Sequence, residues 1–135
     1  MLIEEKNNSS YIDSQGYIYT PGITVTYGGN RYFGYMGIKN MALEEGKEYL
    51  IVAKVEINST DEISALVNRY YRTGIGSSAT ADLFNIGEIH NGQSYILCPF
   101  TYSSQKPVIG FYIDMGINNP TFNGTFSPIE IKLFA

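Results

Sequence analysis

The sequence has no tryptophan, one histidine (His90) and one cysteine (Cys98). A single cysteine excludes an internal disulfide, so stability must come from the core. A Ser–His–acid triad needs a nucleophile on a sharp turn, and no G-x-S-x-G motif occurs. No Cys/His cluster has the spacing of zinc ligands. We therefore expect no triad and no zinc site. His90 should lie on a surface turn, and Cys98 should be a buried small hydrophobic residue.

Positive charge and long apolar runs are also scarce. Nine Lys and Arg residues against thirteen Asp and Glu residues give a net charge of −4, and the basic residues are scattered. Nucleic acids and anionic membranes are bound by clustered basic residues, so we expect neither partner. No apolar run approaches the ~18 residues of a membrane span. The start, MLIEEKNNSS, is acidic and polar where a secretory signal is basic and then apolar. We expect either that the chain is made in the cytoplasm without a signal peptide or that it is a piece of a longer protein.

Aromatic residues and short alternating segments are abundant instead. The 135 residues include 12 Tyr and 7 Phe and are 44% hydrophobic, which suits one globular domain rich in strands. Within EGKEYLIVAKVEI (residues 45–57), the side chains alternate between two sides. Those at odd-numbered positions from 49 to 57 would face the core, and those at even-numbered positions between them would face outward, as in a strand with one face in a core. We expect residues 1–10 to form a flexible N-terminal leader and residues 11–135 to form a single domain.

Turn signals recur at intervals of roughly 8–15 residues, as in β-sandwiches and barrels. Gly28-Gly29-Asn30 and Asn91-Gly92 each predict a hairpin between their flanking strands. Pro99 predicts that its strand lies at a sheet edge there or ends, and Asn123-Gly124 predicts a further turn. In the segment 108–115, alternation predicts Ile, Phe, Ile and Met inward, with the residues between them, including Tyr112, outward. Residues 17–20 are expected to form an additional strand.

The segment 59–72 fits two structures. Its apolar residues follow the i, i+3, i+4, i+7 spacing of an amphipathic helix, and Ser59 with Glu62 would form a capping box. The same residues alternate as a strand from Ser64 to Arg72. We favour the strand because the neighbouring segments are strands and a sandwich requires a partner there. The predicted fold is all-β, an antiparallel β-sandwich.

The span from Gly46 to Phe134 resembles the jelly-roll carbohydrate-binding modules of glycoside hydrolases and of tail and receptor-binding proteins of phages of Gram-positive bacteria. The residues that carry the likeness are EGKEYLIVAKVEI, NGQSYILCPF, VIGFYIDMG and NGTFSPIEIKLF. The resemblance implies a jelly roll and a sugar ligand. Many sugar-binding members stack sugars on Trp, and Tyr offers a similar flat face here. The last strand in the family often carries paired Asp residues, where this chain has Glu130.

Outward positions of the long strands supply the candidate site. If strands pair as in the jelly roll, aromatic and polar side chains share one sheet face, as in a glycan groove. These predicted ligand-binding residues are Lys54, Glu56, Asn68, Tyr70, Arg72, Tyr112 and Asp114. Two alternatives stay open: a subunit interface, where Tyr and Arg are also enriched, and ordinary solvent-facing positions.

Other candidate chemistry is weak. The segment Gly74–Ala79 matches G-x-G-x-x-A, but the sequence after it leaves no room for a crossover helix, so we expect a loop. Glu56 and Asp114 are the only carboxylates worth considering as a glycosidase pair, and isolated strand carboxylates are usually solvated. A structural calcium site has no support, because no D-x-D-x-D run occurs. We expect no cofactor, no metal and no enzymatic activity.

Taken with this resemblance, the sequence predicts a non-catalytic, carbohydrate-binding-like recognition module of a phage tail or extracellular appendage. It would be located in a virion or outside the cell and would bind bacterial surface polysaccharide. The alternative is a structural virion or appendage subunit that uses its exposed aromatic face for self-assembly into a homo-oligomer or for contact with other tail proteins.

Overall fold

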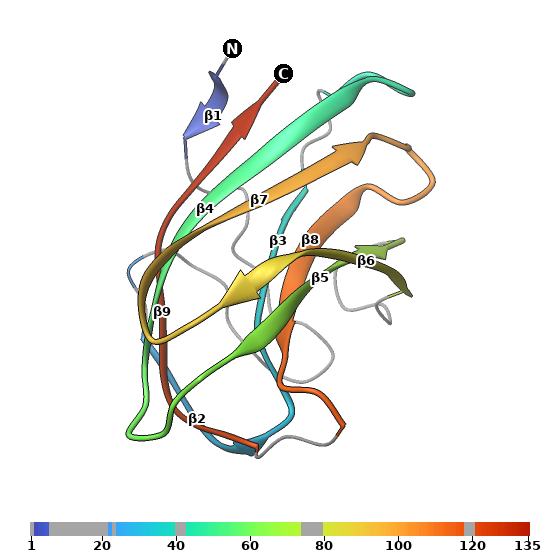
Figure 1. Cartoon of the computed structure of the whole chain (residues 1–135). Helices are drawn as coiled ribbons and strands as arrows, with labels where there is room; N and C mark the ends of the chain where they lie inside the picture. Colours follow the sequence, from blue (N-terminus) through green and yellow to red (C-terminus); the bar gives the residue numbers. More distant parts are fainter. Residues whose placement is uncertain (1, 6–21, 23, 40–42, 74–79, 118–120) are drawn as a thin grey trace.

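The computed structural model describes residues 2–5, 22, 24–39, 43–73, 80–117 and 121–135, and side chains in the ranges 2–5 and 80–84 and at residue 39 are not part of that description. Two antiparallel sheets face each other in a sandwich (Figure 1). The described residues contain no helix, and so none that could span a membrane. The prediction of an antiparallel β-sandwich is confirmed.

The two sheets divide the strands as follows. In the five-stranded sheet, β9 lies between β4 on one side and β1 and β2 on the other, and β4 also pairs with β7. The four-stranded sheet has the order β3-β8-β5-β6. The first sheet contains β1 (Leu2–Glu5), β2 (Val25–Asn30), β4 (Glu48–Asn58), β7 (Gly92–Thr101) and β9 (Phe122–Phe134). The second contains β3 (Tyr32–Lys39), β5 (Ala65–Arg72), β6 (Thr80–Ile89) and β8 (Val108–Asp114).

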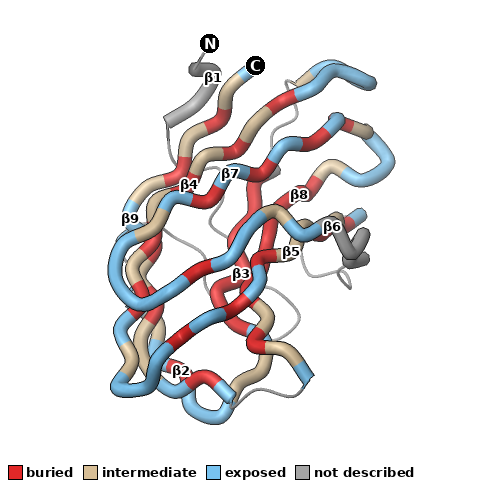
Figure 2. The backbone as a smooth tube through the Cα atoms, viewed as in Figure 1, coloured by how far each residue is buried: buried red, intermediate tan, exposed pale blue. Residues whose placement is uncertain are grey.

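Strand β4 behaves as its alternation predicts. Every second side chain from Tyr49 to Ile57 is buried, and those between are only partly covered, which Figure 2 shows as a regular change of colour along the strand. Its central position between β7 and β9 satisfies both edges of its backbone. The Tyr49 hydroxyl accepts a hydrogen bond from the backbone N–H of Glu44 at 3.0 Å, which fixes the turn before the strand.

The ambiguous segment is a strand, β5, flanked by β8 and β6. Ser59 makes a turn here instead of a helix cap. Its hydroxyl accepts from the backbone N–H of Asp61 at 3.1 Å and donates to the carbonyl of Asn123 at 2.7 Å. Tertiary pairing on both sides outweighs the local helical spacing, as propensity arguments allow.

Both predicted hairpins are wrong. Gly28–Asn30 lie inside the end of β2, and Arg31 alone joins β2 to β3, yet these two strands lie in different sheets. The strands β6 and β7, on either side of His90-Asn91, also lie in different sheets. Gly29 (φ 77°) and Gly92 (φ 95°) supply the positive φ that the turn signals predicted. The side-chain oxygen of Asn91 stabilises the turn between β6 and β7 by accepting a hydrogen bond from the backbone N–H of Ser59 at 3.0 Å. A Gly/Asn turn encodes a sharp reversal, and sequence alone does not show whether the chain stays in its sheet.

Other local expectations have mixed outcomes. Asn123 and Gly124 lie inside β9 opposite β2, so the predicted turn there is wrong. Pro99 lies in β7 at the sheet edge, as predicted. Part of the expected leader, Leu2–Glu5, is strand β1 on β9. The expected strand at 17–20 and the glycine-containing loop at 74–79 lie outside the described residues, and the division into leader and domain stays a prediction.

Aromatic rings fill one end of the core between the sheets. Phe33 of β3 stacks on Phe122 of β9 with ring centroids 3.9 Å apart and planes 8° apart, and Phe126 meets Phe33 edge-on. Such contacts add about 0.5–1.5 kcal/mol beyond burial alone. Cys98 is also fully buried, as predicted, with its thiol 3.9 Å from the Gly110 carbonyl of the other sheet. The core thus joins the two sheets without any disulfide.

Candidate functional site

The outer face of the four-stranded sheet collects most of the predicted site residues. Asn68 lies opposite Tyr112 in the β5–β8 register, and Leu66 lies opposite Asp114. Tyr70 and Arg72 continue the same face of β5, opposite Gly110 and Val108. Ile113 alternates with these residues and points into the sandwich, where it lies beside Phe126 at Gly34.

Three of these residues are buried, although the sequence predicted them to be outward and available. Tyr70, Arg72 and Tyr112 are 0%, 1% and 8% exposed. Tyr35 of β3 stacks on Tyr112 with centroids 5.2 Å apart and meets Tyr70 edge-on at 6.0 Å. The Arg72 guanidinium lies 5.2 Å from the Tyr70 ring centroid. Together, Tyr35, Tyr70, Arg72 and Tyr112 form what we call the tyrosine layer, on the outer face of the four-stranded sheet. Both faces of this part of the sheet are therefore buried.

Lys54 and Glu56 do not join this face. Both lie on β4 in the opposite sheet, so the expectation of a single shared face is wrong. Lys54 lies opposite Tyr95 of β7, with its ammonium 5.7 Å from the ring centroid. The Glu56 carboxylate accepts from the side-chain amides of Gln93 at 3.0 Å and Asn58 at 3.1 Å, and these hydrogen bonds lower its pKa. The sequence could not show which strands share a sheet.

The accessible part of the tyrosine layer is its rim around Tyr32. The Tyr32 side chain is 39% exposed and meets Tyr112 edge-on, with centroids 5.8 Å apart. The Arg31 guanidinium lies 4.8 Å from the Tyr32 ring centroid, and its Nε donates to the Asp114 carboxylate at 3.0 Å. That hydrogen bond raises the pKa of Arg31. Burial raises the pKa of the Tyr112 phenol, and a hydrogen bond to Asn68 acts in the opposite direction.

We call this group the Tyr32 site: Arg31, Tyr32, Asn68, Tyr112 and Asp114. It presents one aromatic face, a fixed cation, a carboxylate and an amide within one corner of the sheet. Arg31 and Tyr32 were missing from the predicted site, because their strand was expected to pair in a hairpin with residues 23–27. An aromatic residue directly after an arginine at a strand start was the only signal for them.

Catalytic groups are not assembled in the described residues. His90 is exposed, with Nδ1 2.9 Å from the Ile63 carbonyl and Nε2 3.8 Å from the Glu88 carboxylate. Glu56 and Asp114 lie in different sheets, so the carboxylate pair considered from the sequence does not form. No group of three or more His, Cys, Asp or Glu within the described part of the chain is placed to hold a metal ion.

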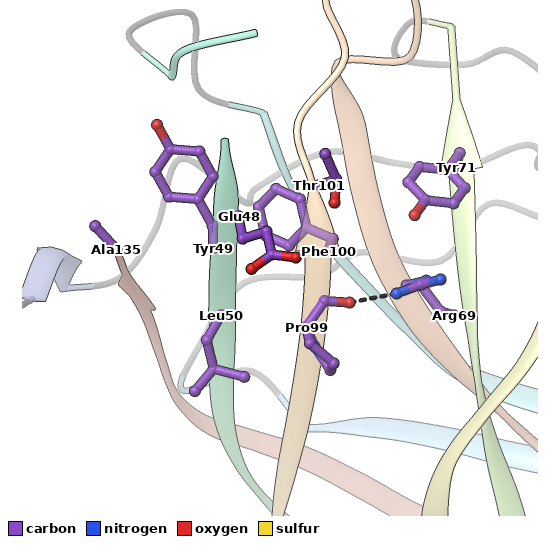
Figure 3. A pocket seen from close by; sticks show the side chains of 9 residues that line it. All are labelled: Glu48, Tyr49, Leu50, Arg69, Tyr71, Pro99, Phe100, Thr101 and Ala135. Atoms are coloured by element: carbon purple, nitrogen blue, oxygen red, sulfur yellow. Dashed lines mark hydrogen bonds between the residues drawn. The ribbon is translucent and has the colours of Figure 1, made fainter. Parts of the chain in front are cut away.

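A pocket of about 530 Å³ opens at the end of the sandwich where β4, β5 and β7 meet (Figure 3). Arg69 of β5 crosses it and donates to the Pro99 carbonyl of β7. The Tyr71 ring is near two cations, with its centroid 5.5 Å from the Arg69 guanidinium carbon and 5.8 Å from the Lys106 ammonium. The volume is within the range of ligand pockets, but its arginine is engaged in joining the two sheets. Sequence analysis did not single out this pocket.

Comparison with known proteins gives a fold and no family. No protein-family model matches the sequence, and no curated protein is similar to it. The structure is similar to the crystallographic structure of the CBM22-1 and GH10 modules of a Clostridium thermocellum endo-1,4-beta-D-xylanase complexed with xylohexaose, with a TM-score of 0.54 and 11% identity. That match covers 96% of this chain and 25% of the xylanase chain, so this chain spans about a quarter of its length.

Two smaller carbohydrate-binding modules are also similar. A family 16 carbohydrate binding module has a TM-score of 0.43 at 16% identity, over 95% of this chain and 86% of that one. The apo structure described as BiXyn10A CBM1 has a TM-score of 0.39 at 13% identity, over 100% and 92%. The likeness to the xylanase modules, the one of these three with a TM-score above 0.5, concerns the fold alone, and it agrees with the β-sandwich that the sequence predicted.

Proposed function

We propose that this chain is a non-catalytic carbohydrate-recognition module and that the Tyr32 site binds the sugar. The observation that carries the proposal is a partly exposed tyrosine ring held edge-on against Tyr112 and flanked by the Arg31–Asp114 pair. The proposed ligand is a bacterial surface polysaccharide, and the proposed setting is a phage tail or another extracellular appendage. The setting rests on the sequence resemblance.

The geometry suits a sugar for three physical reasons. A pyranose ring has an apolar face of C–H groups that packs on an aromatic ring, and Tyr32 offers one that is already oriented by Tyr112. Around the ring, a sugar exposes hydroxyls that both donate and accept. Arg31 donates, the Asp114 carboxylate accepts, and the Asn68 amide does both. A side chain fixed before binding loses little entropy when the ligand arrives.

The test is Tyr32→Ala measured by calorimetry against cell-wall polysaccharides of Gram-positive bacteria, after a glycan array has selected a ligand. We expect the affinity to fall about tenfold or more, which corresponds to the loss of one stacked ring and its oriented neighbours. Tyr95→Ala is the matched control, because Tyr95 is exposed on the other sheet and should not contact the sugar. Silence of the wild-type protein across the array, or equal affinity of Tyr32→Ala, would contradict the proposal.

A further inference from the structure

Strand β7 lies at a sheet edge in the part of the chain that the structure describes. Among the described strands it pairs with β4 alone, on one side. Its sequence, GQSYILCPFT, contains no charged residue over the range Gly92–Thr101. Natural proteins commonly protect an edge of this length with inward or flanking charges, bulges or a covering segment, because its free backbone groups otherwise recruit another strand. Pro99 is the only such device in the strand.

Pro99 also shows which backbone groups of β7 face the open edge. It has no N–H, and its carbonyl accepts a hydrogen bond from Arg69 of the other sheet. A proline within a sheet lies where its nitrogen faces away from the neighbouring strand. In an antiparallel strand, every second residue points both its N–H and its C=O in the same direction. Gln93, Tyr95 and Leu97 therefore turn their N–H and C=O groups to the same open edge as Pro99.

The side chains of these residues are exposed as well. Tyr95 is 64% exposed and Leu97 is 52% exposed on the outer face of the sheet. Tyr95 and Leu97 therefore offer a second strand both backbone groups for hydrogen bonding and apolar side chains to pack against. The glycan ligand proposed above does not account for this surface, because it lies on the other sheet from the Tyr32 site.

We propose that a second copy of this chain binds here, with its β7 antiparallel to the first β7 around a twofold axis at Tyr95. The outward N–H donors between the Gly92 corner and Pro99 belong to Gln93, Tyr95 and Leu97, so a pairing centred on Tyr95 uses all of them. Tyr95 then lies opposite Tyr95 of the second copy, and Gln93 lies opposite Leu97. The two five-stranded sheets become one continuous sheet.

The lack of charge favours a second copy over an unrelated strand. Twofold pairing places identical or symmetry-related side chains directly opposite each other, so any charge at the centre would face its own copy and destabilise the pair. The strand Gly92–Thr101 has none to oppose. A strand from another protein could compensate a charge with its opposite, and would require no such neutrality. The interface is small, so we expect a reversible dimer.

Sedimentation equilibrium of the full chain tests the dimer. We expect the average mass to rise with concentration from 15.1 kDa towards twice that value. Leu97→Pro removes one outward donor per copy and should raise the dissociation constant at least about tenfold, whereas Leu97→Ala keeps the donor and should weaken the dimer less. Glycan binding by the Leu97→Pro monomer should be unchanged, which separates this proposal from the Tyr32 site. A wild-type protein that stays monomeric near 1 mM would overturn the dimer.

Charged substitutions at Tyr95 test the proposed twofold axis. This test does not depend on whether the Leu97→Pro variant folds. Tyr95→Lys and Tyr95→Glu should each be monomeric, because each places like charges opposite one another. An equimolar mixture of the two should dimerise again, since the charges then become complementary. Leu66→Lys, an exposed position on the other sheet, is the control and should leave the dimer intact. A wild-type dimer that survives both single Tyr95 variants, or a mixture that stays monomeric, would refute the proposed axis.

Discussion

Arg31 Nε and Asp114 Oδ1 lie 3.0 Å apart and connect the start of β3 to the end of β8. The same carboxylate accepts from the backbone N–H of Gly116 at 2.8 Å, and the Arg31 carbonyl accepts from the N–H of Met115 at 2.9 Å. The ion pair is therefore one part of a small network that holds both side chains in place beside Tyr32. It gives the rim of the tyrosine layer a defined cation and a defined carboxylate.

The Arg31–Asp114 pair should matter for binding more than for stability. Exposed ion pairs contribute about 0–1 kcal/mol, so Arg31→Ala should change the melting temperature by only a few degrees. Its loss from the Tyr32 site should reduce glycan affinity several-fold, and Arg31→Lys should recover only part of it because lysine lacks the planar fork. Calorimetry and thermal unfolding of the three proteins check this. A large fall in melting temperature with unchanged affinity would contradict the assignment.

Tyr70 should behave as a core residue, although the sequence suggested an outward one. Its ring is 0% exposed and packs against Tyr35 and the Arg72 guanidinium. Tyr70→Ala should destabilise the protein by about 3–5 kcal/mol, as large-to-small aromatic substitutions in cores do. Urea unfolding measures the change. Tyr32→Ala, at the exposed rim of the same layer, should cost much less, and equal costs would argue against a buried tyrosine layer.

Gly110 should tolerate no side chain. A Cβ added there would lie 1.8 Å from the backbone carbonyl oxygen of Met36, and backbone cannot rotate away as a side chain can. Gly110→Ala should force β3 and β8 apart and destabilise by about 3 kcal/mol or more. Gly28→Ala is the matched control, since its Cβ would meet only the Asn123 side chain at 3.8 Å. Similar unfolding midpoints for the two variants would show that the β3–β8 contact is looser than described.

Glu56 should contribute to stability in a way that disappears in acid. Hydrogen bonds from Gln93 and Asn58 lower the pKa of its carboxyl in the folded protein. A lowered folded pKa stabilises the protein above the unfolded pKa of about 4.3, and this contribution is lost as the pH falls through the folded pKa. The advantage of the wild type over Glu56→Gln should therefore be present at neutral pH and shrink below about pH 4. Urea unfolding across that range measures it, and a pH-independent difference would show that the ionised Glu56 carboxylate is not its source.

Cys98 should be unreactive until the protein unfolds. Its side chain is 0% exposed and faces Gly110 across the sandwich. A disulfide-exchange reagent such as DTNB should label it slowly in buffer and rapidly in denaturant, because only the exposed thiolate reacts. The labelling rate thus reports opening of the sandwich, and rapid labelling of the native protein would show that the core around Cys98 opens easily.

Much of the fold could be predicted from local pattern. The alternation from Tyr49 to Ile57 specifies β4 and its buried face, Pro99 indicates a sheet edge, and Cys98 is buried as its type suggests. Each of these depends on one strand and its immediate surroundings. Strand alternation with a period of two carries that information directly.

Sheet membership could not be predicted in the same way. The sequence Asn91-Gly92 is typical of a hairpin, but the turn connects strands of two different sheets. The turn residues specify a reversal of the chain, and packing of the core decides which sheet the next strand joins. Because the sequence does not show which strands share a sheet, Lys54 and Tyr112 were predicted to lie on one face. For the same reason Tyr32 was not predicted as a site residue, since it reaches the site through the pairing of β3 with β8.

Nearly every strand of this sandwich finds its partner far away in the chain. Among the described strands, only β5 and β6 are neighbours in both sequence and sheet, and β9 is the common partner of β1, β2 and β4. During synthesis, those three strands must wait until Phe122–Phe134 has left the ribosome before their sheet can close. Nascent chains stalled before that point should therefore remain sensitive to protease and rely on chaperones, and refolding should be slow for so short a polypeptide.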